Sequence, residues 1–147
     1  MTEENKKLLL KDLSARLTYG VKAYVKNWSK LDRKYYEGIY TVESTHPSLN
    51  TVLAYSDKFA VEVILGYPDD YDIKPYLFPL SSMTEEQRKE YERIIYKSIE
   101  LHCQRYYNVI DVDDFDCLMD FYHKYHFDYR GLIPLDLAID ATGLNIY

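Results

Sequence analysis

The sequence predicts an α+β protein: an N-terminal helix, then a small antiparallel sheet of about four strands, curled or partly barrel-like, then two C-terminal helices and a short tail. Short runs in the first half alternate apolar and polar residues, as half-buried strands do. The flanking segments repeat apolar residues every three or four positions, as amphipathic helices do. For 147 residues we expect a single domain, residues 1–147, with a β-rich lobe at about 18–80 and a helical lobe at about 84–127.

The first predicted helix spans residues 3–17. Thr2 can cap its N-terminus, and Gly20 is the expected stop. Its leucines recur at helical spacing and form an apolar stripe. Asp12 and Arg16 are four residues apart, and we expect this pair on the solvated side of the helix, where it contributes only a few tenths of a kcal/mol.

Four runs with strand-like patterns follow: Val21–Trp28, Tyr35–Ser44, Thr51–Ser56 and Ala60–Tyr67. In the first run, Val21, Ala23 and Val25 alternate with polar residues and are predicted to face the core. Gly38, inside the second run, is a candidate for a β-bulge. The short connections predict an antiparallel meander.

Residues 67–87 predict a junction between the two lobes, because three prolines favour extended backbone there. Its apolar side chains are expected against the core: Ile73, Tyr76, Leu77 and Leu80. Thr84 and Gln87 form a capping box that starts a helix from Glu85 to about Tyr107.

The last predicted helix is capped by Asp111 or Asp113 and runs to about His126. The tail, residues 132–147, fits either a strand or a short helical turn after Pro134.

Composition restricts the function classes. The chain holds 17 Tyr and has a formal net charge of −6, without the long basic stripe that is typical of nucleic-acid binders. Tyrosine suits half-buried rims and interfaces, because it combines an apolar ring with a polar tip. Two cysteines and no signal peptide predict a cytoplasmic protein. No window approaches the roughly 20 apolar residues that span a bilayer, so no membrane contact is expected.

Residues 111–117, DVDDFDC, do not fit a calcium loop, because Asp116 and Tyr122 stand where an EF-hand has Gly and Glu. A zinc site is disfavoured too, because Cys117 lies about 240° around the helix from His123. Phosphate-binding and catalytic motifs are missing as well. We therefore expect no metal, no cofactor and no enzyme activity, although a catalytic site assembled from distant residues stays open.

The stretch HFDYRGLIP, His126–Pro134, fits either an active site or the turn that ends a helix, and we favour the turn. Asp128 can accept hydrogen bonds from nearby backbone N–H groups. Arg130 can bind a carboxylate or free helix carbonyls. Gly131 can adopt the left-handed conformation that such turns need, which directs the next two apolar residues into the core.

Three stretches, LLKDLSARLTYGV, DIKPYLFPLSSMTEEQ and HFDYRGLIPLDLAIDA, resemble a family of small uncharacterised proteins of Bacteroides-type gut bacteria, often encoded in phage or mobile-element regions. The chain differs from that family at Thr18, Phe78 and Leu80. The resemblance implies a biological setting and no mechanism.

The sequence therefore leads to two alternative hypotheses for the function. The leading hypothesis is a non-catalytic protein-interaction module. In a phage or mobile-element setting, such a module would be an accessory protein that acts on a host factor or a defence component. Its candidate contacts are Tyr35, Tyr36, Tyr67 and Tyr71. The alternative is a nucleic-acid-associated accessory that stacks single-stranded bases on the sheet. Its candidate contacts are Lys22, Tyr24, Lys26 and Trp28.

Overall fold

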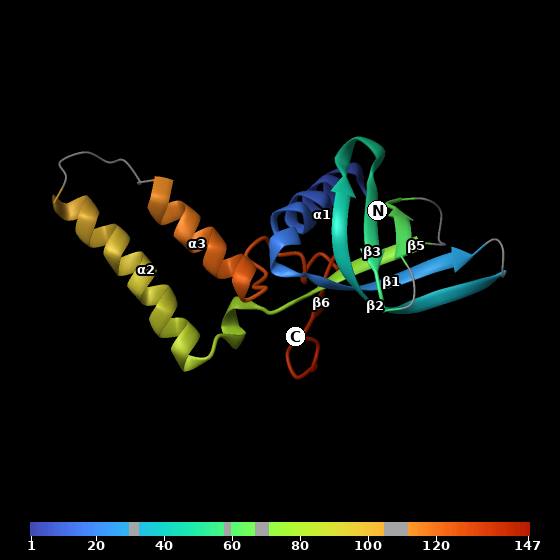
Figure 1. Ribbon diagram of the computed structural model, residues 1–147. Coiled ribbons are helices and arrows are strands. Elements are labelled where there is room, and N and C mark those ends of the chain that lie inside the picture. Colours follow the sequence, from blue (N-terminus) through green and yellow to red (C-terminus); the bar gives the residue numbers. More distant parts are fainter. Residues whose placement is uncertain (30–32, 58–59, 67–70, 105–111) are drawn as a thin grey trace.

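A computed structural model describes the whole chain except residues 30–32, 58–59, 67–70 and 105–111 (Figure 1). The helices of the described part are α1 (Glu3–Ala15), α2 (Glu85–Gln104) and α3 (Val112–Lys124), with short 3-10 turns η1 (Leu17–Tyr19), η2 (Pro47–Leu49) and η3 (Leu80–Ser82). The strands are β1 (Lys22–Ser29), β2 (Lys34–His46), β3 (Thr51–Tyr55), β4 (Ala60–Ile64), β5 (Tyr71–Leu77) and β6 (Ile139–Asp140). The predicted α+β class is confirmed.

The sheet is open and mixed, with the strand order β4-β3-β2-β1-β5-β6. All pairs are antiparallel except β5 and β6. The prediction of about four strands was too low, because the expected extended junction is the strand β5, paired to β1. Pro75 is tolerated there, since β5 has a long partner on one side only and β6 spans just two residues. The tail therefore supplies a short strand.

The apolar core lies on the inner face of this sheet, which α1 covers (Figure 1). Leucines of α1 pack in one cluster with alternate residues of β1 to β5, including Val25, Val63 and Ile73. Cα atoms of β4 come within 8 Å of those in β1 and β5, although β2 and β3 separate these strands in the sheet order. The sheet is therefore curled, as the sequence predicts, and α1 packs against its inner face.

The helices α2 and α3 lie side by side and project from the sheet as a hairpin (Figure 1). Thr84 and Gln87 form the predicted capping box, with distances of 2.8 and 3.2 Å for its two hydrogen bonds. The helix α2 is described to Gln104. Asp113 lies inside α3 and is not its cap, and the alternative cap, Asp111, lies outside the described residues.

Three local expectations were wrong. The bulge lies between Val42 and Ser44, and Gly38 pairs regularly with Val25. Leu80 is 41% exposed, because it sits in the 3-10 turn that leads to α2 and not against the core. The third is the solvated position expected for Asp12 and Arg16, because both side chains are buried. Among the described helices, none combines the length and apolar content needed to cross a membrane.

Candidate functional site

The face of the sheet opposite α1 gathers most of the predicted contact residues. Because Val21, Ala23 and Val25 point inward and are fully buried, the alternate residues of β1 point outward. The register then fixes their neighbours on β2 to β5. We call this surface the outer face; it comprises Lys22, Tyr24, Lys26, Trp28, Tyr35, Glu37, Ile39, Thr41, Leu53, Tyr55, Glu62, Ile64, Asp72 and Lys74.

Aromatic rings and charged groups contact one another at the far end of β1 and β2. The rings of Trp28 and Tyr35 are 4.8 Å apart between centroids, and the Lys26 ammonium lies 4.5 Å from the Tyr35 ring. Tyr24 donates a 2.7 Å hydrogen bond to Glu37, which raises the pKa of Tyr24 to about 12. The Tyr24 hydroxyl therefore stays protonated near neutral pH, and Glu37 holds its position.

Among the outer-face residues named above, cations and carboxylates are equal in number. The three lysines, Lys22, Lys26 and Lys74, are matched by three carboxylates, Glu37, Glu62 and Asp72. Two of the lysines are also engaged by the C-terminal segment: Lys22 donates to the Ile146 carbonyl at 2.6 Å, and Lys74 pairs with Asp136 at 2.7 Å. These two ammonium groups therefore already have partners within the chain.

The four tyrosines predicted as partner contacts do not form one surface. Tyr35 lies on the outer face and is 45% exposed, while Tyr36, its neighbour in the strand, points to the opposite face. Tyr67 and the side chain of Tyr71 lie outside the described part of the structure. By contrast, the four residues predicted for the nucleic-acid alternative do share one face: Lys22, Tyr24, Lys26 and Trp28.

Three exposed apolar residues of the outer face were missed. Ile39 is 48% exposed, Tyr55 is 45% exposed and Ile64 is 38% exposed. The period-two pattern could have shown the direction of Ile39, because Tyr40 and Val42 are the inward residues of β2. The same pattern could have shown the direction of Tyr55, because Val52 and Ala54 are inward residues of β3. Its neighbours on β2 depend on the register at the bulge, which no local pattern reveals.

HFDYRGLIP forms the predicted turn. The Asp128 carboxylate accepts hydrogen bonds from the backbone N–H groups of Leu132 and Ile133, both at 2.8 Å. Gly131 has a φ of +73°, which favours glycine, and Leu132 is fully buried. Asp128, Gly131 and Leu132 therefore form the helix-ending turn that the sequence predicts.

The expectation for Asp12 and Arg16 was wrong, because both side chains are fully buried. Arg16 binds the Asp12 carboxylate through two nitrogens, at 2.7 and 3.0 Å. Its guanidinium also donates to the carbonyls of Tyr122, at 3.3 Å, and Phe127, at 2.7 Å, near the end of α3. The pair therefore connects α1 to the base of the helical hairpin.

Arg130 and Tyr129 complete this buried contact. The Arg130 Nε lies 3.3 Å from Asp12, within ion-pair distance but without hydrogen-bond alignment. The Tyr129 ring is stacked on Tyr122, with centroids 5.0 Å apart. We call this contact the joint; it comprises Asp12, Arg16, Tyr122, Phe127, Tyr129 and Arg130.

The candidate zinc residues are not brought together. The Nε2 atom of His123 is 2.9 Å from the Tyr129 hydroxyl, and the His126 ring is stacked on Tyr147 at 3.8 Å. Cys117 is exposed on α3. Within the described ranges, no three His, Cys, Asp or Glu side chains are grouped so that they could hold a metal ion.

The three stretches that carry the family resemblance meet at the joint and beside it. Arg16 of the first stretch donates to Phe127 of the third. Phe78 of the second stretch exchanges backbone hydrogen bonds of 2.8 and 2.9 Å with residues 126 and 128. The comparisons with known proteins found no matching family model, no matching curated protein and no matching solved structure. The resemblance therefore stays a prediction.

Proposed function

We propose that this chain is a non-catalytic protein-interaction module and that its outer face binds another protein. The observation that carries the proposal is the row of large apolar side chains left exposed on that face: Tyr35, Ile39 and Tyr55. Solvated sheet faces normally carry polar residues, so exposed apolar side chains on neighbouring strands favour an interface. Trp28, packed on Tyr35, adds a second aromatic anchor of the type that dominates binding energy.

The charge pattern supports a protein partner over a nucleic acid. A polyanion is bound through unpaired cations, but the lysines of the outer face are balanced by carboxylates and two are engaged by the C-terminal segment. A protein surface can match both signs of charge around an apolar centre. The partner we propose is therefore a protein with an exposed apolar patch bordered by acidic and basic side chains.

The setting of the proposal comes from the sequence. Its cysteine content favours the cytoplasm. The resemblance to proteins of phage and mobile-element regions favours a host factor or a defence component as the partner.

Affinity capture from host lysate, with and without nuclease, tests the proposal. The bait is the tagged chain, in the wild-type form and as the triple variant Tyr35→Ser, Ile39→Ser, Tyr55→Ser. We expect a stoichiometric protein that survives nuclease with the wild-type bait and is lost with the triple variant. Tyr96→Ser is the matched control, because Tyr96 is 66% exposed on α2, away from the outer face. Equal capture by all three baits would reject the outer face as the interface.

The nucleic-acid alternative has its own test on Lys22, Tyr24, Lys26 and Trp28. If it is right, a labelled single-stranded oligonucleotide binds the chain, and its affinity falls steeply as salt rises, because phosphate contacts release counterions. Lys26→Gln and Trp28→Ala would then weaken binding, and the proposed protein interface would lose its support.

A further inference from the structure

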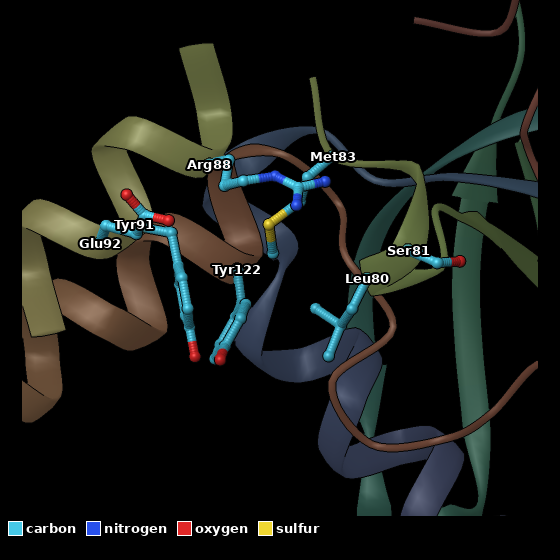
Figure 2. Close-up of a pocket in the computed structure, with 7 residues that line it drawn as sticks. All are labelled: Leu80, Ser81, Met83, Arg88, Tyr91, Glu92 and Tyr122. Atoms are coloured by element: carbon cyan, nitrogen blue, oxygen red, sulfur yellow. The ribbon is translucent and has the colours of Figure 1, made fainter. Parts of the chain in front are cut away.

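A pocket of about 480 Å³ lies at the base of the hairpin, between η3, α2 and α3, and no outer-face residue lines it (Figure 2). Leu80 and Ser81 line it from η3, and Met83 from the segment that precedes α2. Arg88 and Tyr91 line it from α2, and Tyr122 from α3. Its volume lies within the roughly 300–1,000 Å³ that is typical of small-molecule sites.

One wall of the pocket is aromatic and carries two hydroxyls. Figure 2 shows the rings of Tyr91 and Tyr122 side by side with their hydroxyls pointing the same way. The ring centroids are 6.3 Å apart. Burial, and then interaction with the Tyr91 hydroxyl, raise the pKa of Tyr122 to about 12, so its hydroxyl is protonated at neutral pH.

The cation of the pocket is Arg88. Among the described residues its guanidinium has no ion pair. Glu92 stands four residues later on the same helix, but Figure 2 shows Arg88 extended away from it and toward Met83. Two other carboxylates of α2 are engaged elsewhere: Glu85 pairs with Lys89, and Glu90 binds Lys124 and Tyr125. Arg88 therefore lines the pocket as an exposed guanidinium without an ion pair in the described part of the chain.

We propose that this pocket binds a small monocarboxylate with an aryl or alkyl body. The carboxylate pairs with Arg88, whose planar guanidinium can donate two parallel hydrogen bonds. The body packs on Leu80, Met83 and the ring of Tyr91, which supply the apolar wall. Glu92, on the rim, disfavours ligands with several negative charges, such as phosphates. This site is independent of the outer face and adds a small-molecule ligand to the proposed interaction module.

Titration of the full chain with 3-phenylpropionate and with hexanoate, followed by NMR, tests the assignment. We expect saturable shifts confined to residues 80–92 and to Tyr122. The neutral 3-phenylpropionamide and inorganic phosphate should each bind on the order of tenfold more weakly, since a charge-assisted hydrogen bond contributes about that factor.

Arg88→Gln should weaken carboxylate binding by a similar factor, on the order of tenfold. Because Arg88 is an exposed helix residue, this variant keeps the fold. Arg93→Gln is the matched control, since Arg93 is also exposed on α2 but does not line the pocket, and it should bind as the wild type does. The proposal is overturned if neither acid binds saturably, if the amide or phosphate binds as tightly, or if Arg88→Gln leaves the affinity unchanged.

Discussion

The joint and the outer face are built from the same residue types and behave in opposite ways. Each combines tyrosines, cations and carboxylates. In the joint, Arg16 is fully buried and donates to a carboxylate and to two carbonyls. On the outer face, Lys26 is partly exposed and contacts a ring that is itself 45% exposed. Burial and the neighbouring groups, not composition, decide which cluster lies inside the fold and which stays exposed to solvent.

This difference has an energetic consequence. An exposed ion pair contributes about 0–1 kcal/mol, because water and salt screen it. Breaking a buried pair costs several kcal/mol, because the remaining charge is left without solvent or partner. The joint should therefore be sensitive to single substitutions that the outer face tolerates.

Arg16→Ala gives the largest expected effect. It leaves the buried Asp12 carboxylate without its bidentate partner and two carbonyls without a donor, so we expect the free energy of unfolding to fall by about 3–5 kcal/mol. Chemical denaturation at pH 7 measures it. Lys89→Ala, which breaks the exposed pair with Glu85, is the control and should cost about 0–1 kcal/mol. A loss below about 1 kcal/mol for Arg16→Ala would show that the joint does not stabilise the fold.

Two isoleucines, one on each face of the sheet, allow the inner and outer faces to be compared. Ile73 is fully buried on β5, and Ile39 is 48% exposed on β2. Ile73→Ala should lower the free energy of unfolding by about 2–5 kcal/mol, and Ile39→Ala by about 0.5 kcal/mol or less. Denaturation of both variants under the same conditions measures the contrast. Equal losses at the two positions would contradict the assignment of the faces.

His126, beside the joint, should make the fold acid-sensitive. Burial, and then the charges of Arg16, His123 and Lys22, lower the pKa of His126 from 6.5 to about 4. The unfolded chain then binds a proton that the folded chain does not, so stability is complete above pH 6.5 and falls as the pH drops toward 4. His126 alone should account for about 2–3 kcal/mol between pH 7 and 4.5.

His126→Asn tests this prediction, because Asn tolerates the positive φ of +55° at this position. The variant loses the stack on Tyr147 and is expected to be less stable at pH 7. Its loss between pH 7 and 4.5 should nevertheless be smaller than that of the wild type. An unchanged loss in denaturation curves at the two pH values would assign the acid sensitivity to other groups.

The sequence predicts the parts of this molecule that depend on local patterns. The alternation in β1, the Thr84 capping box and the Asp128 turn each involve residues within a few positions of one another, and the structure confirms all three. The strand β5 was missed because Pro75 argues against a strand interior unless the short partner β6 is known.

The joint and the exposed apolar row of the outer face could not be predicted, for physical reasons. Arg16 is buried because Tyr122 and Phe127 supply carbonyls from more than a hundred residues away, and a helical period gives no sign of them. The period of a strand does predict that Tyr35 and Tyr36 point in opposite directions. It does not predict that Tyr35, Ile39 and Tyr55 form one exposed row, because that row depends on the register of β2 and β3 at the bulge.

The affinity of the outer face for its captured partner tests the central claim most directly. It would be measured with purified proteins at low and high salt, for the wild type, for the triple variant at Tyr35, Ile39 and Tyr55, and for Tyr96→Ser. We predict at least about a 100-fold loss for the triple variant with little change in its stability, no loss for Tyr96→Ser and a weak salt dependence. Wild-type affinity in the triple variant, or an affinity that collapses with salt in all three proteins, would contradict the account.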